Sequence, residues 1–262
     1  MTELFSKDHT ILERPFMEFR PFGTDERGEK IRDISGAIVK ANVAHLESCV
    51  SRSSGPEAAA RAIQDLCRLL NERIRDPAYH VTPKFLNNIW HSYSYEFVCY
   101  TREFCERLSG DPQFHFNTGG TQHINAATRI LGQHLSVGQI FSMYPFFVQK
   151  YVSKDMVEIG VANATDRSVT IRLKLTERAF RQFGPYRKRC AEMVCESARG
   201  ALITLPERIH GLPRATAKHG VCMVNGGEWC EWDVAWTPSA GTGLSRLIKR
   251  LFAPLRSETI SS

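Results

Sequence analysis

The sequence predicts an α+β fold in which N-terminal helices pack on an antiparallel sheet that ends in a C-terminal β-hairpin. Three observations predict it. Apolar residues recur at helical spacing through most of residues 35–151, they alternate between residues 155 and 176, and they alternate again around a Gly-Gly step at residues 226 and 227. Helices gathered ahead of strands are typical of α+β folds rather than of alternating α/β folds.

The composition is that of an ordinary globular chain. The 262 residues are 42% hydrophobic and 24% charged, which suffices for one large domain or two small ones. The net charge of +6 is not concentrated in a block, so we expect no nucleic-acid partner. No apolar run has the length of a membrane-spanning helix, and Met1–Asp8 is not a secretory signal, so we expect a cytoplasmic location with reduced thiols.

The first half of the chain is predicted to be helical after a polar arm, residues 1–34. Helical spacing begins at about residue 35, and Gly55-Pro56 opens a second helix, since proline suits the first helical position. This amphipathic pair either covers the sheet or forms a homodimer. A third helix is expected from Thr82-Pro83 to about Leu108, where Gly110 ends it.

Aromatic side chains collect on this third helix and again around Pro145, where a capping box at Ser136 opens a helix that the proline kinks or breaks. Between the two groups, Gly119-Gly120 is predicted to form a plain turn. The aromatic groups form either core or a pocket for a hydrophobic or aromatic ligand. The candidate ligand-binding residues are Trp90, Phe97, Phe141, Tyr144, Phe146 and Phe147.

The second half of the chain changes period. Alternation on both sides of an Asn/Asp-rich turn at residues 163–168 predicts a β-hairpin. A helix is expected from about 177 to 198, then a short strand at Ala201–Thr204, and then the C-terminal hairpin.

That hairpin carries candidate metal ligands. Cys222 and Cys230 flank the Gly-Gly turn, and His219 lies three residues upstream. A tetrahedral zinc site needs four nitrogen or sulfur donors, so a fourth ligand must come from elsewhere. Cys190 and Cys195 are five residues apart on the preceding helix, and a helix separates such positions by roughly 140°, so only one of them is expected to contribute. The alternative is that the cysteines are buried thiols without a metal.

A family resemblance rests on the same residues. The C-x3-G-x3-C unit from Cys222 to Cys230, followed by Trp232 and Val234 at alternate positions, resembles the end of a 4-vinyl-reductase-like domain, as does Ala198-x-Gly200 after a helix. Such domains occur in bacterial phenol-responsive activators and in N-terminal sensor regions of bacterial signalling proteins. The likeness covers about residues 150–238.

The resemblance implies a small-molecule-binding domain that zinc stabilises. It implies zinc ligands at Cys222, at Cys230, at His219 (where the activators carry a glutamate) and at one helix cysteine. Counting back from Gly200, Cys190 falls nearest to that helix position. Residues 150–189 contain no tryptophan, so phenol itself is not the expected ligand.

The predicted organisation is an arm at 1–34, one α+β sensor domain at 35–238, and a linker with a basic amphipathic helix at 239–262. That tail helix either contacts an anionic membrane surface or a partner, or is a solvated tail. We expect a ligand-binding sensor that signals to an output module or partner.

The alternatives are a zinc- or thiol-dependent enzyme of pigment or aromatic metabolism and, more weakly, a trafficking or assembly adaptor. Motifs for dinucleotide binding, serine hydrolases and metalloproteases are missing from the sequence. A haem would need an axial ligand, for which His91, His115, His123 and His134 are the candidates.

Overall fold

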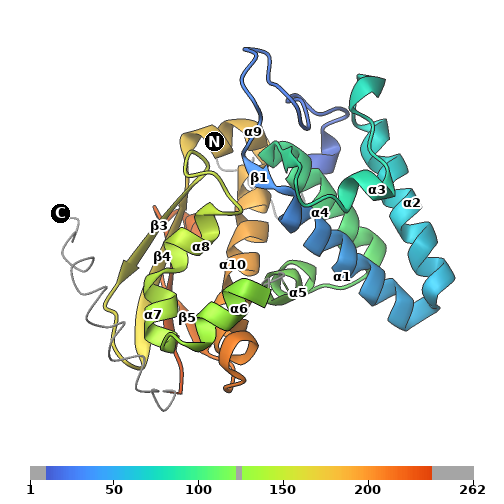
Figure 1. Ribbon diagram of the computed structural model, residues 1–262. Coiled ribbons are helices and arrows are strands. Elements are labelled where there is room, and N and C mark those ends of the chain that lie inside the picture. Colours follow the sequence, from blue (N-terminus) through green and yellow to red (C-terminus); the bar gives the residue numbers. More distant parts are fainter. Residues whose placement is uncertain (1–9, 122–125, 238–262) are drawn as a thin grey trace.

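The computed structural model describes residues 10–121 and 126–237, and it confirms the α+β class. A helical group and a four-stranded sheet lie on opposite sides of one long helix, α10 (Arg187–His210) (Figure 1). The helical group contains α1 (Gly36–Ser54), α2 (Pro56–Glu72) and α4 (Tyr95–Ser109). Helix α10 is therefore the central element of the fold.

The prediction that the N-terminal helices pack on the sheet is wrong. Helices α1, α2 and α4 pack mainly on one another, and the sheet contacts α7 (Val137–Ser142), α8 (Tyr144–Gln149) and α10 instead. The apolar stripe of α2 is buried inside the chain, with Leu66 and Leu70 fully covered. The two amphipathic helices thus use their apolar faces within one molecule.

The predicted third helix is divided in two. Helix α3 (Pro83–Leu86) ends after one turn, and α4 starts only at Tyr95. The Asn88 side chain accepts a hydrogen bond from the backbone N–H of Trp90 at 2.9 Å, an alternative to helical pairing that asparagine favours. The short strand β2 (Ser92–Tyr93) pairs with β1 (Ile34–Ser35), and Ser94 then caps α4.

Two further predictions are wrong around α10. Gly119-Gly120 lies in a helix, α5 (Phe114–Thr121), and Ala201–Thr204 continues α10 instead of forming a strand. The cause is tertiary, because α5 crosses α10 at backbone contact. A Cβ atom on Gly119 would lie 1.8 Å from the carbonyl oxygen of Ser197, and one on Gly200 would lie 2.0 Å from that of Phe116. Only glycine permits this approach.

The segment before the sheet follows the prediction. Helix α6 (Ala126–Gln133) precedes α7, whose capping box is present: Ser136 Oγ accepts from the N–H of Gln139, and the Gln139 side chain accepts from the N–H of Ser136. Helix α7 ends at Ser142, and α8 begins at Tyr144 with Pro145 in its first turn, so the proline marks a break.

The sheet is antiparallel throughout, in the order β3-β4-β6-β5. Its strands are β3 (Val157–Ala162), β4 (Ser168–Leu175), β5 (Thr216–His219) and β6 (Cys230–Ala235). The predicted β3–β4 hairpin is present, and Asn163 in its turn has a positive φ of 50°. Helix α9 (Glu177–Phe183) and the 3-10 turn η4 (Gly184–Tyr186) connect β4 to α10.

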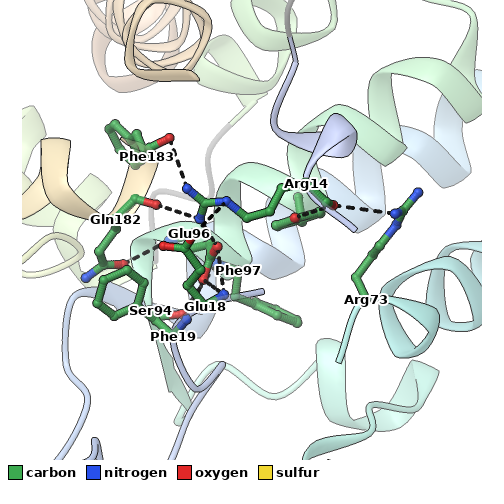
Figure 2. A network of polar contacts seen from close by, with 10 residues as sticks. Arg14, Glu18, Phe19, Arg73, Ser94, Glu96, Phe97, Gln182 and Phe183 are labelled. Atoms are coloured by element: carbon green, nitrogen blue, oxygen red, sulfur yellow. Dashed lines mark hydrogen bonds and ion pairs between the residues drawn. The ribbon is translucent and has the colours of Figure 1, made fainter. Parts of the chain in front are cut away.

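The described part of the N-terminal arm, residues 10–34, packs on the helices. It contains the 3-10 turn η2 (Ile11–Glu13), and a second such turn, η3 (Pro77–Tyr79), lies after α2. Arg14 pairs with the fully buried Glu96 of α4 and donates a hydrogen bond to the carbonyl oxygen of Gln182 at 3.2 Å. Figure 2 shows the Glu96 carboxylate also facing Glu18 and Phe19, whose backbone N–H groups donate to it. This network ties the arm to α4 and α9.

The predicted tail at 239–262 lies outside the described residues. Within the described ranges, no helix has both the length and the apolar character needed to cross a membrane.

Candidate functional site

Four metal-ligating side chains meet where α10 faces the β5–β6 hairpin. The sulfur atoms of Cys195, Cys222 and Cys230 and one ring nitrogen of His219 all lie within 4.8 Å of one another. Cys222 Sγ is 3.5 Å from Cys230 Sγ and 3.8 Å from Cys195 Sγ, and Cys195 Sγ is 3.6 Å from His219 Nε2. The three cysteines are buried and His219 is exposed, so the cluster reaches solvent on its imidazole side.

These separations fit four donors around one ion. Metal–sulfur bonds of about 2.3 Å and metal–nitrogen bonds of about 2.0 Å give a tetrahedron with S–S edges of about 3.8 Å and S–N edges of about 3.5 Å. The observed distances match those edges. A disulfide would need about 2.05 Å between the sulfur atoms, and all eight cysteines are free.

The hairpin differs from its prediction in a way that builds the cluster. Strand β5 ends at His219, before the first cysteine, and Met223–Asn225 forms a 3-10 turn, η5, instead of continuing the strand. Gly226 closes this turn with a φ of 87°, which favours glycine. The N–H of Gly227 then donates to the Cys222 carbonyl oxygen at 2.9 Å. The chain thereby folds Cys222 back toward Cys230, the first residue of β6.

The charge of the cluster is concentrated on one sulfur. A hydrogen bond from the Cys195 thiol lowers the pKa of Cys230 to about 6, whereas the same contact raises the pKa of Cys195. Burial raises the pKa of Cys222. One thiolate with two neighbouring thiols is a ready set of ligands, since a metal ion replaces thiol protons.

Of the two helix cysteines, the structure places Cys195 in the cluster. Cys190, which the family resemblance favoured by its distance from Gly200, is fully buried and forms a hydrogen bond with Cys99 of α4. Burial raises the pKa of the Cys190 thiol. The two cysteines thus face different neighbours, as their helical separation predicts.

A second candidate site is an apolar cavity of about 150 Å³ between α10, α1, α4, α8 and the sheet. Helix α10 contributes Val194, Ser197, Ala198 and Ala201, which lie on one side of the helix, and several residues further along. Strands β3 and β4 contribute Val157 and Leu173. Val194 and Ser197 flank Cys195 in sequence, so α10 forms a wall of both sites.

Two of the predicted ligand-binding aromatics line this cavity, Tyr144 and Phe147 of α8. Phe146 is 54% exposed and packs under the Lys150 ammonium group, 4.6 Å from the ring centre. It is not among the lining residues.

The other three predicted aromatics lie elsewhere. Phe97 is fully buried and stacks on Tyr93 with ring centres 4.9 Å apart, and Phe141 is fully buried against Trp236. Trp90 is 88% exposed because the break before α4 removes it from the helical stripe.

Several polar lining residues were not singled out from the sequence, among them Tyr95, Arg102 and Ser197. Tyr95, Val98 and Arg102 are spaced three and four apart, so they share one face of α4. An arginine within an apolar helical stripe was the signal available in the sequence. The sequence alone does not show that this arginine faces a cavity, because Ser197, to which it donates a hydrogen bond, comes from α10.

A smaller group consists of His45, Cys49 and Asp111. His45 Nε2 lies 3.1 Å from Asp111 Oδ2 and 3.4 Å from Cys49 Sγ. The same histidine nitrogen faces both partners, so the ring cannot relay a proton from Cys49 to Asp111. We interpret this group as a hydrogen-bonded tie between α1 and the start of α5.

No family model and no curated protein matches the sequence. Among solved structures, a mutant H-NOX protein from S. oneidensis in the Fe(II) ligation state is 15% identical with a TM-score of 0.44 and covers 80% of this chain and 99% of its own. The Fe(II) unliganded H-NOX protein from K. algicida is 11% identical with a TM-score of 0.43, over 79% of this chain and 98% of its own. At these values the likeness concerns the general arrangement of elements and carries no conclusion about function.

The comparisons correct two predictions. The resemblance to a 4-vinyl-reductase-like domain is wrong, because no family model matches and the matching structures are H-NOX proteins. Zinc as the cofactor is corrected by the same finding, since Fe(II) is the metal with which those structures are described.

The haem alternative can be tested on the described residues. His91 stacks on Phe85, His115 lies beside Glu106, and His134 is exposed. None of these three lines the cavity, and neither does any described cysteine or methionine. His123 lies outside the described residues. The described cavity walls therefore do not fit a haem with a histidine, cysteine or methionine ligand.

Proposed function

We propose that this chain is a sensor domain that binds a small apolar molecule in the cavity beside α10. Cys195, His219, Cys222 and Cys230 hold one metal ion that fastens the hairpin to the same helix. The observation that carries the proposal is that α10 supplies Cys195 to the cluster and supplies Val194 and Ser197, on either side of it, to the cavity.

The metal ion has a structural role in this proposal. Four protein donors complete a tetrahedral shell and leave no position for water or substrate, as in structural rather than catalytic sites. The ligand acts by preferring one of two arrangements of α10 over the other, because a ligand shifts an equilibrium only through differential affinity. A partner that contacts the hairpin end of α10 would detect the change.

Ligand binding is tested by a cavity-filling substitution. Toluene and benzyl alcohol are expected to raise the melting temperature of the wild-type protein, because a molecule that binds only the folded state stabilises it. Ala198→Leu places three more carbon atoms in the cavity wall and is expected to abolish the shift. The matched control is Ala60→Leu on the exposed face of α2, which should retain it. A wild-type protein that neither compound stabilises contradicts the proposed pocket.

The metal site is tested by elemental analysis across the first-row transition metals. We expect close to one ion per wild-type chain and none in Cys195→Ser. Cys190→Ser is the control, because that thiol is equally buried on the same helix but faces Cys99. Equal metal content in the two variants, or metal-free folded wild type, would remove the metal from the proposal and leave a cluster of three thiols.

A further inference from the structure

The charged side chain of Arg102 lies in the cavity wall without an ionic partner among the described residues. Arg102 of α4 is only 6% exposed and lines the cavity. Its hydrogen bond is a long one, to Ser197 Oγ at 3.4 Å. The nearest acids in sequence, Glu103 and Glu106, pair with Arg189 instead. Among the residues that the structure describes, no carboxylate forms an ion pair with Arg102.

An unpaired buried guanidinium is costly. Arginine remains protonated at every pH at which proteins fold, so burial cannot be relieved by losing the charge. Buried charges are accordingly paired with an opposite charge. The cavity is the space through which a counter-ion from outside the chain can reach Arg102.

The rest of the cavity wall favours an anion. None of its described lining residues is acidic, and Lys150 and Arg208 add two more basic residues to Arg102. Hydroxyl-bearing residues also line it, among them Tyr95 and Tyr144, which are 3% and 8% exposed. Neither of these two hydroxyl groups has a hydrogen-bond partner among the described residues. Hydrogen-bond donors and positive charge, with no acidic residue among the described lining, attract and orient an anionic group.

We propose that the ligand of this cavity is an amphipathic carboxylate. Its carboxylate pairs with the Arg102 guanidinium and accepts a hydrogen bond from a tyrosine hydroxyl, and its apolar part lies along Val194, Ala198 and Ala201 of α10. A cavity of about 150 Å³ is of the size that admits one benzene ring, which sets the apolar part at roughly six carbon atoms. This inference rests on the proposed function and names the class of its ligand.

The experiment compares charged and neutral molecules of the same shape. Dissociation constants are measured by calorimetry for benzoate against benzyl alcohol and for hexanoate against 1-hexanol. We expect the carboxylate of at least one pair to bind more than tenfold tighter, since a charge-assisted hydrogen bond to arginine is stronger than a neutral one. In Arg102→Met, which retains the apolar stem, that preference is lost while benzyl alcohol still binds. Arg107→Met, the same change at an exposed position of α4, is the control.

The possible results separate the two proposals. If the alcohols bind and neither carboxylate binds tighter, the carboxylate inference is overturned and the proposed pocket stands. If none of the four molecules binds, the proposed pocket fails and the inference fails with it. The wild-type comparison decides the matter alone if Arg102→Met does not fold. A preference that survives in Arg102→Met assigns the anion to another cation and overturns the role of Arg102.

Discussion

The buried carboxylate of Glu96 is predicted to be one of the most sensitive positions of the fold. It pairs with Arg14 and accepts hydrogen bonds from the N–H groups of Glu18 and Phe19 at 3.0 Å and 2.7 Å (Figure 2). Glu96→Ala leaves the guanidinium with carbonyl acceptors and the exposed Glu18 carboxylate, 3.4 Å away. Breaking a buried ion pair costs about 3–5 kcal/mol, and each buried backbone N–H left without a hydrogen-bond partner costs about 1–3 kcal/mol more.

These contributions are not additive, because the arm can move and admit water to the exposed donors. We therefore expect Glu96→Ala to lower the free energy of unfolding by about 5 kcal/mol, which is comparable to the whole stability of many domains. Glu96→Gln retains one acceptor oxygen and the shape of the side chain, so its loss should be about half as large.

Urea denaturation followed by far-ultraviolet circular dichroism measures this loss. The control is Glu57→Ala, which removes a glutamate from an exposed pair with Arg61, 4.0 Å apart, and should leave the unfolding midpoint unchanged. If the free energy of unfolding of Glu96→Ala is within about 1 kcal/mol of the wild-type value, the buried pair does not hold the arm in place and the reasoning is refuted.

Three other predictions concern separate parts of the chain. Gly119→Ala should cost about 3 kcal/mol in urea denaturation, because the added Cβ would lie 1.8 Å from the Ser197 oxygen, whereas Gly160→Ala, whose nearest contact is 3.7 Å, should cost less than about 1 kcal/mol. Burial acts to raise the pKa of Asp111, but hydrogen bonds from Asn117 and His45 lower it below the ordinary 3.8. This carboxylate therefore stabilises the fold above pH 3.8, and the stabilisation is lost as pH falls through the lower pKa of the folded state. Asp111→Asn should thus flatten the decline of stability between pH 4 and pH 2, and an unchanged slope would contradict this. Trp90→Ser should leave both the unfolding free energy and benzyl alcohol affinity unchanged, because the side chain is 88% exposed; a weaker affinity would show that Trp90 contacts the ligand.

The sequence predicts those elements whose signals are local. Gly55-Pro56 separates α1 from α2, the Ser136 capping box opens α7, and the Asn163 turn joins β3 to β4. The failures are tertiary. Nothing within Ala201–Thr204 distinguishes a buried helix from a strand, because a short apolar run suits both. The helical conformation is decided by the crossing of α5 and α10 at Gly119 and Gly200, which are 81 residues apart in sequence.

The candidate sites divide in the same way. Spacing within one hairpin brought His219, Cys222 and Cys230 together as candidates, but the choice between Cys190 and Cys195 depends on how α10 is rotated against the sheet. The cavity was less predictable, since its described walls come from five helices and three strands that are far apart in the sequence. Aromatic density indicated Tyr144 and Phe147, but it also indicated Phe97 and Phe141, which are buried in the hydrophobic core.

The sharing of α10 has a thermodynamic consequence for both proposals. Cys195 and Ala198 are three residues apart, so their side chains lie about 60° apart on the helix, and a rotation that accommodates a ligand also moves the Cys195 sulfur. If ligand and metal favour the same arrangement of α10, each raises the affinity of the protein for the other by the same factor.

This reciprocity can be measured from either side. We expect the dissociation constant of benzyl alcohol to increase when the metal is removed from the folded protein by a chelator, and the metal to dissociate more slowly when the ligand is bound. Cys195→Ser should bind the ligand with the affinity of the chelated wild type, since both lack the link between hairpin and helix. Equal ligand affinity in the metal-bound and metal-free folded protein would mean that α10 behaves as a rigid wall, and the cluster would then stabilise the hairpin without taking part in sensing.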